Sequence, residues 1–215
     1  HVRSRRQRQM CIRDSLTITF NDIPLFSPKQ IEQWRNEVML PAHIAAHCDA
    51  VAAVADQCAQ YVLTDGIIIR PTFLNHAARL HDLLRFVDFD PKQANRFHQA
   101  SEDEEMQWQT LRDQYGNQHE IACASFLKDQ QLYALASVVE AHGPRYPYDE
   151  RRTIEQKLLF YADKRVKFDE VVTIEERFRD FRERYTDGAV TAEGQQWEEE
   201  AKQMERELGF ESFNL

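Results

Sequence analysis

Apolar residues recur every three or four positions through most of the chain, the spacing of one face of an α-helix. Pro and Gly residues interrupt this spacing and divide the chain into segments. Ser or Thr followed three residues later by Glu or Gln marks several helix starts. The pattern predicts helices over about 28–38, 41–63, 71–84 and 102–114, from 117 or 118 onward, over 131–142 and 150–168, from 173 onward, and over 191–208.

Two of the predicted helices carry well-defined apolar faces. The inner face of the helix at 41–63 includes Ile44, His47, Cys48, Val51, Ala55, Cys58 and Val62. The acidic helix at 191–208 has a seam of Trp197, Ala201, Met204 and Leu208, which suits docking on the rest of the chain or on a second subunit of a homodimer. A strand-like run, LTITF at 16–20, is too short to change the class. We therefore expect an all-α bundle with a C-terminal accessory helix.

Composition limits the class of protein further. The 215 residues suffice for one well-buried domain, and the hydrophobic and charged fractions of 42% and 29% are those of an ordinary soluble protein. No apolar run approaches the roughly 18 residues of a membrane span. The four cysteines, at 11, 48, 58 and 123, form no C-x-x-C pair. These features predict a reduced, cytoplasmic protein without a membrane partner.

Charge is distributed unevenly along the chain. Residues 1–15 hold five Arg and one Asp, whereas the rest holds 22 basic and 35 acidic residues. An acidic body argues against binding a nucleic-acid polymer. The basic start is either a targeting segment, an arginine-rich arm or translated adapter sequence, and its RQRQMCIRDS string favours the last. We expect a non-native leader over 1–15, a helical core over 16–185 and an acidic C-terminal helix over 186–215.

Histidines and aspartates on several predicted helices are the candidate functional residues. The adjacent pair His81 and Asp82 lies late in an otherwise apolar helix, which is an unusual place for two polar side chains. Four imidazoles and two carboxylates that converge are what a site for one or two divalent transition metals requires. The candidate ligands are His47, His81, Asp82, His119, His142 and Asp163.

The order H…HD…H…H…D over residues 40–185 resembles the HD-domain metal-dependent phosphohydrolase superfamily. The strings HCDAV at 47–51, AARLHDLLR at 77–85 and YADKRV at 161–166 carry the resemblance. It implies an HD-domain helical bundle in which His47, His81, Asp82 and Asp163 bind metal. Small HD hydrolases with a dinuclear centre place two further histidines where His119 and His142 lie. The polar segment between Asp82 and His119 is longer than is usual for them.

The resemblance implies a metal-dependent phosphohydrolase acting through metal-activated water. The substrate would be a phosphomonoester or phosphoanhydride, such as a nucleotide or another small phosphorylated metabolite, and Fe, Mn, Co or Zn would suit the ligands. Asp82 is expected to be shared between metals and, with Arg85, to be catalytic. Arg85 is the preferred phosphate ligand. Lys164 and Arg145 are either further substrate-binding cations or solvated surface charges.

Two other functions remain open at this point. A few HD-fold proteins with a similar ligand set use a mixed-valent di-iron centre to oxidise substrates with O2, and they need both His119 and His142. The chain could instead be a non-catalytic metal-binding interaction module. The sequence contains no P-loop, no dinucleotide-binding G-x-G-x-x-G and no serine nucleophile elbow, which leaves metal-activated water as the route to hydrolysis. His43, His76 and His98 match no family position and are expected at the surface, and Glu140 is expected to point away from the site.

Overall fold

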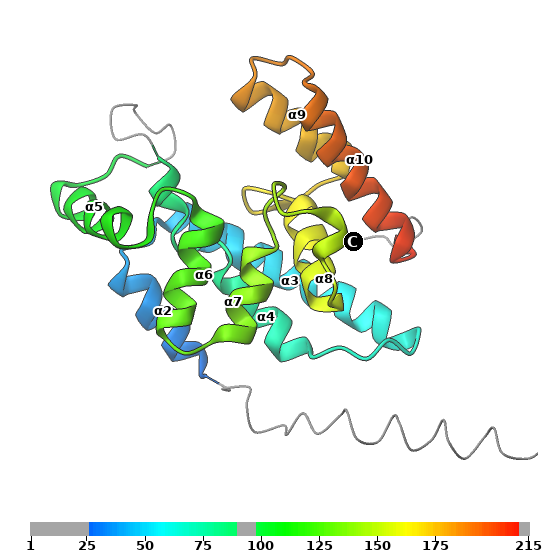
Figure 1. Ribbon diagram of the computed structural model, residues 1–215, viewed down its shortest axis with the longest axis horizontal. Coiled ribbons are helices and arrows are strands. Elements are labelled where there is room, and N and C mark those ends of the chain that lie inside the picture. Colours follow the sequence, from blue (N-terminus) through cyan, green and yellow to red (C-terminus); the bar gives the residue numbers. More distant parts are fainter. Residues whose placement is uncertain (1–25, 90–97, 211–215) are drawn as a thin grey trace, which may run out of the picture.

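The computed structural model describes residues 26–89 and 98–210, and over these ranges the predicted all-α class is confirmed (Figure 1). The α-helices are α2 (Pro28–Glu37), α3 (Ala42–Thr64), α4 (Pro71–Leu80), α5 (Glu102–Tyr115), α6 (His119–Asp129), α7 (Tyr133–Glu140), α8 (Ile154–Lys164), α9 (Ile174–Tyr185) and α10 (Ala192–Glu207). The shorter elements are the 3-10 helices η2 (Arg85–Asp88) and η3 (Tyr148–Glu150) and the strands β1 (Val166–Lys167) and β2 (Glu170–Val171). The predicted leader and the strand-like run at 16–20 lie outside the described residues.

Helix α3 runs through the middle of the bundle and packs along α4 and against α8 (Figure 1). The whole predicted inner face of α3 is buried. Buried alanines on both helices, among them Ala55 and Ala77, place little side-chain volume between the α3 and α4 backbones and so permit close packing. The hydrophobic core is therefore built around α3, and His47 projects from the same helix that organises it.

Helix α4 ends one residue before His81, earlier than its apolar pattern predicts. From Leu80 onward the backbone hydrogen bonds span three residues instead of four: Leu83 donates to Leu80, and Arg85 donates to Asp82. The chain then continues through a turn into η2. Because of this tighter winding, His81 and Asp82 lie in a turn and not on the face of an α-helix.

Capping residues determine where several helices begin. Reciprocal capping boxes form at Ser101, Thr153 and Thr173, and each satisfies a backbone N–H at the start of its helix. The box at Thr153 explains why α8 begins at Ile154 and not near residue 150. Ser27 lies three residues before Gln30, a spacing that predicts another capping box, but the Ser27 side chain forms no capping hydrogen bond. Helix α2 therefore relies on Pro28 in its first turn and on core packing.

A small β-hairpin follows α8, where the sequence predicts a continuing helix. Helix α8 stops at Lys164, and β1 pairs antiparallel with β2 in the register Val166 with Val171 and Lys167 with Glu170. Phe168, in the two-residue turn, has a φ of 56°. A left-handed conformation costs a residue with a Cβ about 1–2 kcal/mol, so surrounding contacts must hold it in place.

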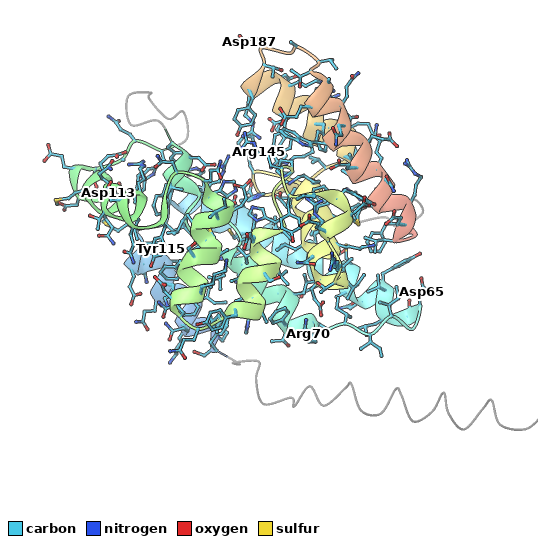
Figure 2. The ribbon with its side chains drawn as sticks, in the orientation of Figure 1. Asp65, Arg70, Asp113, Tyr115, Arg145 and Asp187 are labelled. Carbon is cyan, nitrogen blue, oxygen red and sulfur yellow. The ribbon has the colours of Figure 1, made fainter. Side chains whose placement is uncertain are left out.

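Helices α9 and α10 form a hairpin that packs against α8 at one end of the molecule (Figure 1). Asp187 lies at the tip of this hairpin, far from Asp65 in the α3–α4 connection (Figure 2). Ala201 and Met204 are fully buried, Leu208 is buried and Trp197 is half-buried, so the predicted seam of α10 docks on its own chain.

Two further observations concern the described residues as a whole. Cys48, Cys58 and Cys123 are buried free thiols, in keeping with the expected absence of a disulfide scaffold among them. None of the described helices combines the length and the apolar character needed to cross a membrane.

Candidate metal centre

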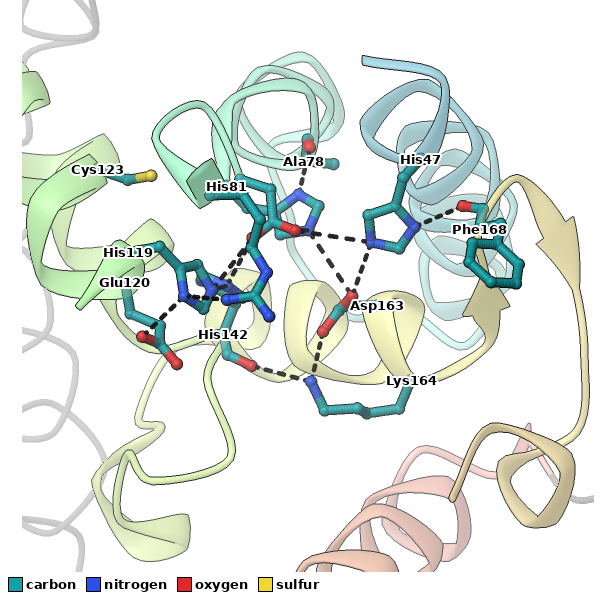
Figure 3. Close-up of polar contacts among 12 residues, drawn as sticks. His47, Ala78, His81, His119, Glu120, Cys123, His142, Asp163, Lys164 and Phe168 are labelled. Carbon is teal, nitrogen blue, oxygen red and sulfur yellow. Dashed lines mark hydrogen bonds and ion pairs between the residues drawn. The ribbon is translucent and has the colours of Figure 1, made fainter. Parts of the chain in front are cut away.

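Six side chains from five parts of the fold converge between α3, α4, α6, α7 and α8 (Figure 3). The sequence predicts all six as metal ligands. They are His47 in α3, His81 and Asp82 after α4, His119 at the start of α6, His142 just after α7 and Asp163 near the end of α8. All six are buried, with exposed fractions of 8% or less. The structure therefore brings together side chains that lie up to 116 positions apart in the sequence.

Asp82 divides the cluster into two groups of ligands. His47, His81 and Asp82 form one group, whereas Asp82, His119 and His142 form the other; within each group the ligand atoms lie within 4.8 Å of one another. Asp82 is the member that the two groups share. The arrangement can therefore hold a metal ion on either side of one carboxylate.

The two oxygens of Asp82 face different histidines. Oδ2 lies 3.7 Å from His81 Nε2 and 4.0 Å from His47 Nε2. Oδ1 lies 3.2 Å from His119 Nε2 and 3.4 Å from His142 Nε2. A carboxylate with one oxygen toward each group is suited to bridging two cations.

Asp163 adds its carboxylate to the His47 and His81 side. Its Oδ1 lies 3.1 Å from His47 Nε2 and 3.7 Å from His81 Nε2. Figure 3 shows this oxygen between the two imidazoles, with the other oxygen turned toward Lys164. The first group thus offers two imidazoles and two carboxylates, whereas the second offers two imidazoles and one carboxylate.

Three of the four imidazoles are oriented by backbone carbonyl groups through Nδ1. His47 Nδ1 lies 2.7 Å from the Phe168 carbonyl oxygen, and His81 Nδ1 lies 2.7 Å from that of Ala78 (Figure 3). His142 Nδ1 contacts the Val139 carbonyl oxygen. A carbonyl oxygen only accepts, so each Nδ1 carries the proton and each Nε2 presents a lone pair. This is the usual arrangement behind metal-bound histidines.

A carboxylate orients the fourth imidazole. Asp88 in η2 accepts from the backbone N–H of His119 at 2.9 Å and contacts His119 Nδ1 at 2.6 Å. Arg85 Nη1 lies 2.8 Å from the same Nδ1 and also forms an ion pair with Asp88. Since the guanidinium is always protonated, Arg85 and Asp88 favour opposite tautomers of His119. The shorter contact to Asp88, together with a second carboxylate oxygen, Glu120 Oε2, at 3.2 Å, favours the proton on Nδ1, which leaves Nε2 free as a ligand.

The centre contains polar atoms without a suitable hydrogen-bond partner. His81 Nε2 and Asp82 Oδ1 are both buried and form no well-directed hydrogen bond. The Nε2 atoms of His119 and His142 lie 3.2 Å apart, and when both rings are neutral, with their protons on Nδ1, their lone pairs face each other. Such contacts are unfavourable unless a cation lies between them. The donor set of imidazole nitrogens and carboxylate oxygens therefore fits a divalent transition metal.

The electrostatics of the cluster differ from those of isolated side chains. Burial alone would raise the pKa of Asp82, but positive charge on His81 and His119 outweighs it and holds that pKa well below 3.8. Burial likewise opposes ionisation of Asp163, but neighbouring Lys164 keeps its pKa well below the ordinary value. Both carboxylates are thus anionic at neutral pH and available to a metal.

The histidines respond in opposite directions to the same surroundings. The pKa of His81 lies well above 6.5, because the charge of Asp82 outweighs the effect of burial. The pKa of His119 is also raised, since contacts with Asp82 and Asp88 outweigh burial and the nearby Arg85. Burial lowers the pKa of His142. Metal binding must therefore displace protons, chiefly from His81 and His119.

A cavity of about 470 Å³ opens beside the two ligand groups. Asp82, His119, His142 and Asp163 line its inner end, and residues of the α9–α10 hairpin line its outer wall. Its volume lies within the range of about 300–1,000 Å³ that is typical of small-molecule sites. The cavity is therefore large enough for a small metabolite next to the centre.

The three predicted substrate-binding cations all line this cavity but differ in their surroundings. Arg85 is held by Asp88 and His119, so it contacts the partners of the ligands as well as the cavity. Arg145 is exposed and lies between the body and the hairpin (Figure 2). Lys164 is 2% exposed and ion-paired with Asp163, so the alternative of a solvated surface role is wrong for this residue. Its position follows from the burial of the last turn of α8.

The remaining predictions about individual polar residues have mixed outcomes. Glu140 points away from the centre, as predicted, and pairs with Lys128. His43 and His98 are half-buried. His76 is buried, which contradicts the surface position expected for it, because its ring stacks on Phe26 at 4.4 Å.

Sequence reasoning did not find three groups that act on the centre. Asp88 orients His119, the Phe168 carbonyl orients His47, and Arg177 of α9 lines the cavity. Asp88 lies three residues after Arg85, and this spacing in a 3-10 turn is the signal that sequence analysis could have used. The Phe168 carbonyl and Arg177 carry no comparable local signal.

Comparison of the chain with protein-family models, curated proteins and solved structures gives no significant match. Any statement about activity must therefore come from the residues and their geometry.

Proposed function

We propose that the chain is an HD-type metal-dependent phosphohydrolase with a dinuclear centre. The observation that supports this most strongly is the position of Asp82, whose two oxygens face two separate groups of imidazole Nε2 atoms. His47, His81, Asp82 and Asp163 would hold one ion, and Asp82, His119 and His142 the other. The order of these ligands along the chain is the order that resembles the HD superfamily.

A divalent metal bound here would supply Lewis acidity, lowering the pKa of water toward neutrality and neutralising charge on a phosphoryl group. The chain's own groups would prepare the site for that role. Phe168, Ala78 and Val139 fix three imidazoles through their carbonyl groups, and Asp88 fixes the fourth. Arg85 would stabilise charge on the phosphoryl oxygens, because it lines the cavity beside Asp82.

The cavity supports a small phosphorylated substrate. Cationic side chains lie near its inner end, and aromatic side chains of the hairpin, including Phe181 and Trp197, line its outer part. An anionic group could therefore lie beside the centre while an apolar or aromatic body contacts the hairpin. A nucleotide or another compact phosphate ester has this character, whereas the acidic body of the chain disfavours a nucleic-acid polymer.

Metal analysis followed by a phosphoester screen tests the proposed function. The protein should bind Fe, Mn, Co or Zn and hydrolyse at least one nucleotide, dinucleotide, cyclic nucleotide or small sugar phosphate. Asp82→Ala should lose most of the metal and all of the turnover while keeping the helical circular dichroism spectrum. Wild-type metal content in Asp82→Ala would refute the assignment of Asp82 as the shared ligand.

The convergence of both His119 and His142 on Asp82 also supports the second function, a mixed-valent di-iron oxygenase. The two functions give different signals in one preparation. An oxygenase loaded with iron should show a visible absorption band and consume O2 with its substrate, whereas a hydrolase should release phosphate without O2 consumption. Bound metal without either reaction would favour a non-catalytic interaction module.

A further inference from the structure

Arg177 in α9 is a buried cation that lines the cavity beside the candidate ligands. Only 7% of its surface is exposed, and its guanidinium lies 4.2 Å from the centre of the Phe181 ring. A buried arginine ordinarily uses most of its five N–H groups in hydrogen bonds, because each unpaired N–H loses its hydration. The hydrogen-bond partners of Arg177 therefore show whether its N–H groups are used within the protein or remain available to a ligand.

Those partners leave most of the guanidinium unused. Nη1 donates to Asp180 Oδ2 at 3.3 Å, whereas the buried Nε has no hydrogen-bond partner. Asp180 does not belong to Arg177 alone, because Lys167 lies 3.5 Å from it and Arg184 also pairs with it. Three cations thus share one carboxylate, and the positive charge of Arg177 is only partly compensated.

Lys164 is a second buried cation that lines the same cavity. Its Nζ pairs with Asp163 and lies 3.4 Å from the His142 carbonyl oxygen, which places it next to the ligands (Figure 3). Only 2% of Lys164 and 7% of Arg177 is exposed, and two further cations, Lys167 and Arg184, lie around the carboxylate that pairs with Arg177. An anion entering the cavity would relieve this excess of positive charge.

We infer that Arg177 and Lys164 form an oxyanion receptor that binds a tetrahedral anion such as phosphate beside the metal centre. Arg177 supplies the directional part, because a planar guanidinium can donate two parallel N–H bonds to two oxygens of one phosphate. Lys164 supplies a point charge near Asp163. The Phe181 ring packs against the guanidinium and limits its movement. This inference rests on the proposed function only in taking the anion to be the phosphate of the substrate.

Inorganic phosphate is the probe for this receptor. Its dissociation constant is measured by calorimetry on the Mn²⁺-loaded protein for wild type, Arg177→Ala, Arg177→Lys and Arg179→Ala. Arg179 is the matched control, because it lies on the same helix and its side chain is 62% exposed. Arg177→Ala should weaken phosphate binding about tenfold or more, as expected for the loss of charge-assisted hydrogen bonds. Arg179→Ala should bind phosphate like wild type.

Arg177→Lys separates recognition from folding. Lysine keeps the charge beside Asp180 and so preserves the ion pair, but it lacks the two-pronged geometry. Its melting temperature and Mn²⁺ content should match those of wild type, while its phosphate affinity should lie between those of wild type and Arg177→Ala. Should Arg177→Ala fail to fold, Arg177→Lys decides the matter by itself. The inference would be overturned if Arg177→Lys, and Arg177→Ala where it folds, bound phosphate as tightly as wild type. It would also be overturned if the wild-type protein did not bind phosphate.

The outcomes also distinguish this inference from the proposed function. If phosphate binding depends on Arg177 but no phosphoester is hydrolysed, the receptor stands and the hydrolase does not. If the wild-type protein hydrolyses phosphoesters while the Arg177 variants keep normal phosphate affinity and normal KM, the hydrolase stands and the receptor does not.

Discussion

Replacing Asp88 should weaken one of the two metal sites and spare the other. Asp88 contacts no ligand atom that faces a metal, but it holds the proton on His119 Nδ1. In Asp88→Ala the nearest acceptor is gone, and in the parent geometry Arg85 Nη1, at 2.8 Å, is then closer to Nδ1 than the remaining acceptor, Glu120 Oε2, at 3.2 Å. Arg85 can only donate, so it would draw the imidazole into the tautomer that carries its proton on Nε2. Such an imidazole has no lone pair on Nε2, the nitrogen that faces the centre.

The size of the effect follows from the bonds involved. Loss of a partner that orients a metal-bound histidine typically costs 10–100-fold in metal affinity, and the tautomer shift places Asp88→Ala near the upper end, about 100-fold. Asp88→Asn retains one carbonyl oxygen and exchanges a charge-assisted hydrogen bond for a neutral one of roughly half the strength. That difference of about 1–1.5 kcal/mol corresponds to about a tenfold loss of metal affinity in Asp88→Asn.

Calorimetric titration with Mn²⁺ at pH 7.5 resolves the two binding steps. The weaker step, which we attribute to the group containing His119, should shift in Asp88→Ala, and the step of the His47 group should not. Exposed Asp113 provides the control in Asp113→Ala, which should titrate like wild type. The double variant Arg85→Ala with Asp88→Ala should recover part of the lost affinity, because no donor then opposes the ligating tautomer. An unchanged second step in Asp88→Ala, or equal weakening of both steps, would refute the reasoning.

Three further predictions concern catalysis, pH and the C-terminal helix. Arg85→Ala should lower phosphoester turnover about a hundredfold, which is the usual cost of losing one charge-stabilising donor. Arg85→Lys should recover only part of the lost turnover. Calorimetry should show that the His47 group still binds Mn²⁺ in both variants. In metal-free protein, the raised pKa of His81 contributes stability that is full below pH 6.5 and is lost as pH rises through the folded value, whereas the lowered pKa of Asp82 contributes stability that is lost below pH 3.8. The free energy of unfolding in urea should therefore be greatest between these two pH values, with His142, whose pKa is lowered, contributing in the opposite sense to His81. Saturating Mn²⁺ should remove the loss of stability above pH 6.5. A free energy of unfolding that does not change with pH would contradict the burial of charged imidazoles. Met204→Ala should cost about 2–4 kcal/mol in urea unfolding without altering Mn²⁺ affinity, and a loss below about 1 kcal/mol would mean that α10 does not pack on the body through this side chain.

The convergence of the six candidate ligands could be predicted from sequence because each carries its own chemical signal. A histidine or aspartate within an apolar helix is costly unless it has a partner, and six of them in a known order indicate a common site. The starts of α5 and α9 were predictable for the same local reason, since Ser101 and Thr173 each lie three residues before their capping partner. The all-α class followed from the apolar spacing, because the bundle buries the faces that this spacing defines.

The partners of the ligands were not predictable, because tertiary packing alone brings them to the site. The Phe168 carbonyl reaches His47 only because a two-residue turn holds Phe168 at positive φ, 121 positions away in sequence. His76 is buried by an aromatic stack with Phe26, whose position no local pattern determines. Lys164 is buried because the last turn of α8 packs inside the fold and lines the cavity, which no local pattern of the sequence indicates.

Anomalous X-ray diffraction from crystals of the Mn²⁺-loaded protein tests the dinuclear centre most directly. Data collected on the two sides of the manganese absorption edge locate each bound ion without reference to activity. The geometry predicts two peaks on either side of Asp82, one beside His47, His81 and Asp163 and the other beside His119 and His142. A single peak, or two peaks that do not share Asp82 as a ligand, would contradict the proposal of a dinuclear centre bridged by this carboxylate.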